Sequence, residues 1–202
     1  MWLQTVPKTI NLTTMTLCAK KSSPTNPPRA ATPIAFVNAV VHAYERYGKT
    51  PELALHAAQI TPELLNDLDA CITSKQMEAL CNAAMRELDD EALGWFSRKL
   101  PWGSYGLLCR ASLGAKTLEI ALKRWFRHHL LMTDDLILTL SIEGSDAVIT
   151  LNEQKDFGPL REFCLVTSLR YLHGYACWAI DSNIALRAAA FPFARPGHEQ
   201  VY

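Results

Sequence analysis

The sequence predicts an α+β domain in which helices come first and a small antiparallel sheet follows. Apolar residues recur at helical spacing through the first two thirds of the chain, and the period changes to two after Asp135. A β-hairpin, a long helix and one more strand then complete the pattern. Because the helices precede the strands instead of alternating with them, we expect a small antiparallel sheet packed by helices.

Length and charge set the first limits on function. The chain has 202 residues, and its 20 Lys+Arg balance its 20 Asp+Glu. A protein that neutralises many phosphates needs a basic excess, so this balance argues against nucleic-acid binding by the chain as a whole. The sequence has no apolar run of about 18 residues and no signal-peptide pattern, so we expect a cytoplasmic protein without a membrane partner.

Residues 1–31 differ in composition from the rest of the chain. They carry four basic residues and no acidic residue, with three prolines clustered up to Pro28. Such a composition does not offset the entropy lost on ordering. We therefore predict a flexible, basic, Pro-rich leader over 1–31 and an effector-binding and dimerisation domain over 32–202.

Threonine residues mark the predicted helix starts in the first part of the chain. Thr-Pro pairs beginning at Thr32, Thr50 and Thr61 predict helix starts, because threonine caps helices and proline fits the first turn. Thr73 with Gln76 three residues later forms a capping box for a further helix.

Two more helices are predicted over 104–112 and 117–131. Basic side chains concentrate around the second, at Lys116, Lys123, Arg124, Arg127 and His128. On a helical wheel, Leu122, Trp125 and His129 share an apolar stripe, whereas the lysine and arginines within the helix lie elsewhere. We therefore expect the basic side chains to form a solvent-exposed face of a helix whose apolar stripe packs on the core, and we favour this over a nucleic-acid-binding surface.

The sheet begins with alternation from Leu136 to Ile142, a turn at 143–146 and a returning strand, AVITL. A helix over 160–180 is apolar on most of its circumference, which predicts a central position. Residues 184–193 are the third predicted strand. The chain then ends within what resembles the first turn of a helix, so we expect a domain truncated at its C-terminal end.

No motif for a hydrolase nucleophile, a phosphate-binding loop or a dinucleotide site occurs, so we assign no catalytic residue and no cofactor. The six cysteines form no C-x-x-C pair, and most of them sit among apolar neighbours that suit a reduced, buried cysteine. The adjacent histidines His128 and His129 point about 100° apart on a helix, so we assign no metal ligands. The acidic run 87–91 lacks calcium-loop spacing and is expected to be a solvated helix junction.

An enzyme hypothesis pairs His129 with Asp134 or Asp135, and it rests only on their closeness in the sequence.

Aromatic residues on the apolar helices supply a candidate ligand site. Tyr171 and Trp178 lie seven residues apart on one face of the long helix, and Trp125 shares its stripe with His129. Small-molecule pockets are mostly apolar with a few polar groups. The candidate ligand-binding residues are thus Trp125, His129, Tyr171 and Trp178, with a purely structural role in the core as the alternative.

In order and spacing, five segments within 32–202 resemble the N-terminal effector-binding region of AraC-type transcriptional regulators, in the branch whose sensor is not a cupin barrel. They are TPIAFVNAVVHAYERYG, ALCNAAMRELDDEALGWFSRKL, YGLLCRASLGAKTLEIALKRWFRHHLLMTDD, LTLSIEGSDAVITL and IALRAAAFPFARPGHEQVY.

This resemblance implies a cytoplasmic bacterial transcription regulator whose domain senses an unknown small-molecule effector and often dimerises, so we expect a homodimer. Because no catalytic constellation occurs in the sequence, we expect no enzymatic activity. A C-terminal pair of helix-turn-helix units reads DNA in that family. The chain ends at Tyr202, before such units, so we assign no DNA-binding residue within it. A ligand-free dimerisation or protein-interaction module is the alternative.

Overall fold

The computed structural model describes residues 12–18 and 31–199. The helices are α1 (Ile34–Arg46), α2 (Glu52–Ala57), α3 (Pro62–Leu65), α4 (Ser74–Leu88), α5 (Ser104–Ser112), α6 (Leu118–Met132), the 3-10 helix η1 (Gly158–Leu160) and α7 (Arg161–Ala179). The strands are β1 (Leu12–Cys18), β2 (Ala31–Pro33), β3 (Cys71–Thr73), β4 (Leu136–Glu143), β5 (Asp146–Glu153) and β6 (Ala185–Ala190). The α+β fold class is thus confirmed.

Two of the four threonine signals occupy the predicted cap position, Thr61 for α3 and Thr73 for α4, whereas α2 is capped by Pro51 and not by Thr50. The capping box of α4 is complete, because the Thr73 hydroxyl accepts from the Gln76 amide and the Gln76 side chain accepts from the Thr73 amide. Thr32 is not a cap: it is buried in β2, pairs with Ile72 of β3, and leaves the cap position of α1 to Pro33. Thr32 is therefore part of the β2–β3 pairing and does not cap α1.

Within the described residues, four antiparallel strands form the main sheet in the order β4-β5-β1-β6. Strand β1 lies within the predicted leader, so the expectation of flexibility is wrong for residues 12–18 and for Ala31, which begins β2; residues 1–11 and 19–30 of the leader lie outside the described residues. Met15 and Leu17 alternate with threonines and are buried, at 2% and 4% exposure. Their apolar surface lies in the core, which offsets the ordering cost that composition alone made prohibitive.

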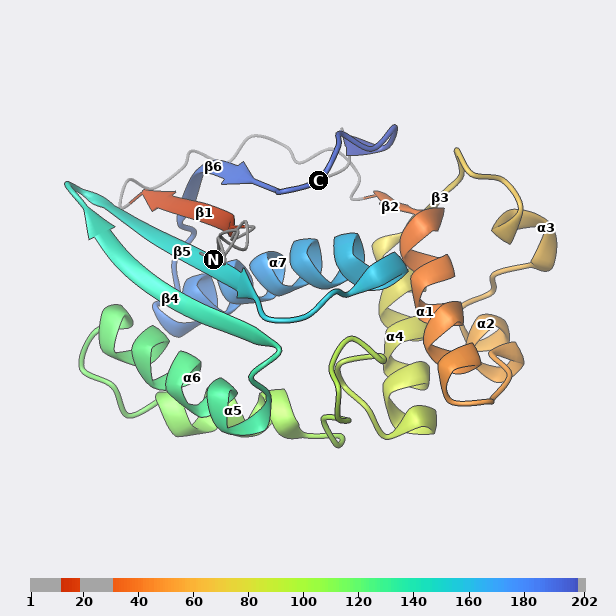
Figure 1. Ribbon diagram of the computed structural model, residues 1–202, viewed down its shortest axis with the longest axis horizontal. Helices are drawn as coiled ribbons and strands as arrows, with labels where there is room; N and C mark the ends of the chain where they lie inside the picture. Colours follow the sequence, from red (N-terminus) through yellow and green to blue (C-terminus); the bar gives the residue numbers. More distant parts are fainter. Residues whose placement is uncertain (1–11, 19–30, 200–202) are drawn as a thin grey trace, which may run out of the picture.

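Helix α7 occupies the centre of the molecule. It runs from beside α1 and α4 to the region beneath the main sheet, while α5 and α6 lie side by side below it (Figure 1). Its predicted central position is confirmed by buried residues spread around its circumference, from Phe163 to Ala176. None of the described helices, α7 included, has the length and apolar character needed to cross a membrane.

Candidate functional site

A cavity of about 240 Å³ lies between α4, α5, α6, α7 and the beginning of β4. This volume is slightly below the roughly 300–1,000 Å³ typical of pockets for drug-sized ligands, and it suits a small metabolite. Its lining residues are Met85, Glu91, Trp95, Trp102, Tyr105, Gly106, Trp125, His129, Leu136, Leu138, Thr167, Ser168, Tyr171 and Leu172. We refer to it as the aromatic cavity.

Three of the four candidate ligand-binding residues surround this cavity: Trp125 and His129 from α6, and Tyr171 from α7. Trp178 does not line it. Trp178 is 59% exposed and its ring lies 6.1 Å from that of Tyr175. Seven residues return a helix to nearly the same face but also advance it by about 10 Å, so Trp178 lies further along α7 than the cavity wall extends.

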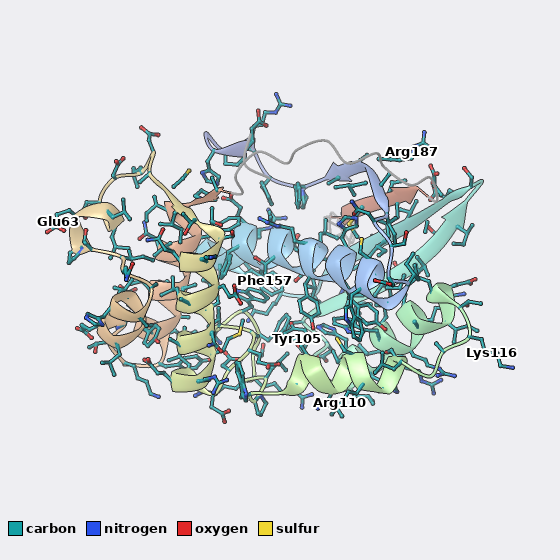
Figure 2. The ribbon with its side chains drawn as sticks, turned by 180° about the vertical axis from the view of Figure 1, so that it is seen from behind. Glu63, Tyr105, Arg110, Lys116, Phe157 and Arg187 are labelled. Carbon is teal, nitrogen blue, oxygen red and sulfur yellow. The ribbon has the colours of Figure 1, made fainter. Side chains whose placement is uncertain are left out.

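The aromatic rings form one continuous cluster. The Tyr105 ring centroid lies 5.0 Å from that of Tyr171 and 6.0 Å from that of Trp125, which in turn stacks on His129 at 5.3 Å. Tyr105 lies between α5 and α7, whereas Arg110 of the same helix points away from the protein (Figure 2). These contacts fix the rings before any ligand arrives, which reduces the entropy lost on binding.

His129 is buried and electrically neutral near physiological pH. Burial lowers its pKa from 6.5 to about 4, because the surrounding rings do not solvate the imidazolium. Its Nδ1 atom has no hydrogen-bond partner among the described residues. His129 thus presents a neutral imidazole to the cavity, with one nitrogen able to donate and the other to accept.

The enzyme hypothesis of a His129–aspartate pair gains no support from this geometry. The Asp135 carboxylate accepts from the backbone amide and hydroxyl of Ser97 and lies 4.0 Å from Lys155 Nζ. Asp134 is exposed. A general base needs an orienting partner within hydrogen-bond reach, and neither aspartate supplies one to His129 Nδ1.

Two tryptophans of the cavity wall also carry unpartnered polar atoms. The Nε1 atoms of Trp95 and Trp125 are buried and, among the described residues, meet no acceptor. Buried indole N–H groups normally find a partner, and an unpaired buried donor costs about 1–3 kcal/mol. Together with His129 Nδ1, these groups leave three residues of the cavity wall with an unpaired nitrogen that is itself shielded from solvent.

The loop between α4 and α5 holds Trp95 and Trp102 in place through a buried carboxylate. Asp90 has no exposed surface, and its two oxygens accept from the backbone amides of Ala92, Gly94 and Leu100 and from the Tyr47 hydroxyl, at 2.7–3.0 Å. Four hydrogen bonds use the acceptor capacity of the carboxylate. The expectation of a solvated acidic junction is therefore wrong here, because the loop amides replace water around the charge.

Glu91 is the second buried acid of that junction and a member of the cavity wall. Its two carboxylate oxygens accept from the amides of Gly103 and Tyr105 at 2.8 and 2.7 Å, at the N-terminal end of α5. A negative charge at this end complements the helix dipole. Sequence reasoning considered Glu91 only as part of the acidic run 87–91 and not as a site residue, because the Pro-Trp-Gly turn whose amides it binds lies at the far end of the loop.

Metal ligation has no candidate in the described part of the chain, where no three His, Cys, Asp or Glu side chains gather. The described cysteines are unpaired. The expectation that most of them are buried holds fully for Cys164 and is wrong for the exposed Cys71. Cys177 Sγ lies 3.7 Å from His173 Nε2, but that nitrogen lies 2.9 Å from the Ile184 carbonyl, to which it must donate. This leaves it unable to accept the thiol proton.

The basic stretch around α6 is a solvated face, as predicted. Lys123, Arg124 and Arg127 are exposed, whereas Trp125 and His129 are buried on the stripe beside the cavity. Lys123 also forms an ion pair with Glu119 at 2.6 Å. The cations of α6 therefore point away from the candidate site.

An enclosed aromatic cavity with a few polar groups, set in an α+β domain, is typical of a small-molecule-binding domain. The chain belongs to the family described as the N-terminal arabinose-binding domain of AraC transcription regulators, whose model matches residues 48–202. The resemblance seen in the sequence is thus confirmed.

One curated relative is the ornithine utilization regulator of Pseudomonas aeruginosa, which is 21% identical over 171 residues. This alignment covers 84% of the chain and 50% of the relative, so the chain spans about half of that protein's length. No solved structure matches the chain. The family is that of transcription regulators and the relative is a regulator, which supports a regulatory, ligand-sensing role for the domain.

Proposed function

We propose that this domain senses a small-molecule effector by binding it in the aromatic cavity. The single observation that carries the proposal is a cavity of about 240 Å³ walled by aromatic side chains, among them Trp95, Trp125, His129 and Tyr171, with Glu91 as a polar group in its wall. An apolar pocket with a few polar groups suits a small organic ligand. Trp125, His129 and Tyr171 are then ligand contacts, and Trp178 is not.

The regulatory consequence follows from where the cavity walls come from. The walls belong to α4, α5, α6 and α7, so a ligand that contacts all four favours one arrangement of these helices. A ligand shifts such an equilibrium only by its preference for one state. We propose that this shift is passed to a DNA-binding domain of the helix-turn-helix type, in a cytoplasmic bacterial regulator.

Homodimerisation is part of the proposal and has its own support. Leucines stay exposed along two adjacent helices, at Leu107 of α5 and its C-cap residue Leu113, and at Leu130 and Leu131 of α6. Leu131 is 74% exposed, and burying such side chains against a second copy gains free energy. Sedimentation equilibrium tests this proposal, with a concentration-dependent dimer as the expected result and a monomer at all concentrations as the contrary one.

A thermal-shift screen of metabolites of different charge tests the sensing proposal. A specific ligand at a hundred times its dissociation constant stabilises the domain by about 2.7 kcal/mol. We expect Ser168→Leu, which adds a side chain to the cavity wall, to abolish the shift. Gly174→Ala is the matched control on α7, because a Cβ there meets nothing within 4 Å.

The ligand-free alternative makes the opposite prediction. A domain used only for dimerisation shows no stabilisation by any metabolite, and Ser168→Leu then leaves the response of the protein to the screen unchanged. An unchanged ligand shift in Ser168→Leu contradicts the placement of the site.

A further inference from the structure

The aromatic cavity is asymmetric in charge. Among its described lining residues Glu91 is the one with a formal charge, since His129 is neutral. Glu91 is 8% exposed, and none of the ion pairs within the described residues includes it. The cavity therefore has a negative end whose carboxylate forms no ion pair with a described cation.

Glu91 keeps acceptor capacity after its structural hydrogen bonds are counted. Each carboxylate oxygen accepts one backbone amide, from Gly103 or Tyr105, whereas a carboxylate offers about four lone-pair sites in total. The helix dipole of α5 supplies only a partial positive charge. A cationic group in the cavity thus meets both free acceptor sites and an uncompensated charge in a medium of low dielectric constant.

The aromatic part of the cavity wall also favours a positively charged ligand. Tyr105, Trp125 and Tyr171 form a cluster with ring centroids 5.0–6.0 Å apart, and all three rings border the cavity. Aromatic faces attract cations, and this attraction strengthens when the cation is desolvated. Trp102 is not counted here, because the Arg86 guanidinium already lies 4.4 Å from its ring centroid.

We propose that the effector is a compact organic ammonium ion whose charged nitrogen lies between Glu91 and the rings of Tyr105, Trp125 and Tyr171. Free carboxylic acids and phosphates without a cationic group are excluded, because Glu91 repels them and no wall residue among those described carries a positive charge. This inference rests on the proposed sensing function.

Paired probes test the preference for positive charge. Choline and its uncharged isostere 3,3-dimethylbutan-1-ol form one pair, and butylammonium and butan-1-ol form the other. Quenching of tryptophan fluorescence measures binding, since three tryptophans line the cavity. We expect the ammonium member of at least one pair to bind ten times more tightly or better than its partner; equal or weaker binding of both ammonium probes, or none, overturns the proposal.

Substitution of Glu91 assigns the preference to this carboxylate. We expect Glu91→Gln to weaken the preferred ammonium probe at least tenfold and to leave its isostere unchanged, which also shows that the cavity is intact. Glu91→Asp keeps the charge and should keep the preference. Glu119→Gln, at an exposed acid of α6, is the control without effect. If Glu91→Gln weakens the binding of both probes equally, or weakens the binding of neither, Glu91 only caps α5.

The two proposals fail in different ways. If both ammonium probes fail while an uncharged or anionic compound stabilises the protein and loses that effect in Ser168→Leu, the ammonium inference is wrong and the sensing function stands. If no compound of any charge binds, the sensing function itself fails.

Discussion

The imidazole of His129 stacks on the indole of Trp125 one helical turn away, with ring centroids 5.3 Å apart and an angle of 13° between the planes. Both rings belong to the buried stripe of α6, and both line the aromatic cavity. The stack removes the imidazole from water. The stability of the domain should therefore depend on pH, because a buried imidazole resists protonation.

We therefore expect His129 to destabilise the protein as pH falls. Its pKa is about 4 in the folded state against 6.5 for the free side chain, so the unfolded state binds more protons between these values. The free energy of unfolding should fall by about 3 kcal/mol between pH 6.5 and pH 4 from this group. Urea unfolding at several pH values measures it.

His129→Phe is the comparison variant, since it keeps a ring in the stack and removes the titration. Its stability should fall less steeply than that of the wild type below pH 6.5. Above that pH the two slopes should agree. Parallel curves down to pH 4 contradict a neutral, buried His129.

Asp90 should be among the most sensitive positions in the loop that carries Trp95. Asp90→Asn places an amide donor against at least one of the groups that now donate to the carboxylate. We expect a loss of about 3 kcal/mol, whereas Tyr47→Phe removes one hydrogen bond and should cost about 1 kcal/mol. Equal, small effects on chemical unfolding argue against the buried network.

Strand β1 makes a prediction that separates an ordered strand from a flexible leader. Leu17→Ala should destabilise the domain by about 2–4 kcal/mol, because its side chain is buried in the core. Thr16→Ala, on the other face of the strand, should cost less than about 1 kcal/mol. If both substitutions are neutral in thermal unfolding, residues 12–18 do not contribute to the sheet.

Gly174 offers a stabilising change in the middle of α7. A Cβ at this position meets nothing within 4 Å, and helix interiors favour alanine over glycine by about 1 kcal/mol. Gly174→Ala should raise the melting temperature and leave ligand binding unchanged. A lowered melting temperature indicates that α7 needs a glycine here for a reason beyond its own helical conformation.

The fold was largely predictable because its local signals are strong. The capping box at Thr73, the alternation in β4 and the apolar circumference of α7 each report a short-range preference. Strand β1 was missed because its partners, β5 and β6, lie more than 120 residues away in the chain. Composition cannot reveal a pairing that only the assembled sheet provides.

The site was predictable only in part. Trp125, His129 and Tyr171 follow from helical periodicity, which also suggested Trp178 because periodicity does not show where a cavity ends along a helix. Glu91 and Trp95 lie on an irregular loop, whose course depends on the hydrogen bonds of Asp90. No periodic pattern places such residues.

The central claim is that the aromatic cavity binds a small molecule, and the tryptophans allow it to be tested by position. Trp95, Trp102 and Trp125 line the cavity, whereas Trp178 lies outside it. ¹⁹F NMR of protein labelled with 5-fluorotryptophan, titrated with the strongest stabilising compound, follows each of them. We predict shifts for the three cavity resonances and none for Trp178; a shift of Trp178 with Trp125 unmoved contradicts the assigned site.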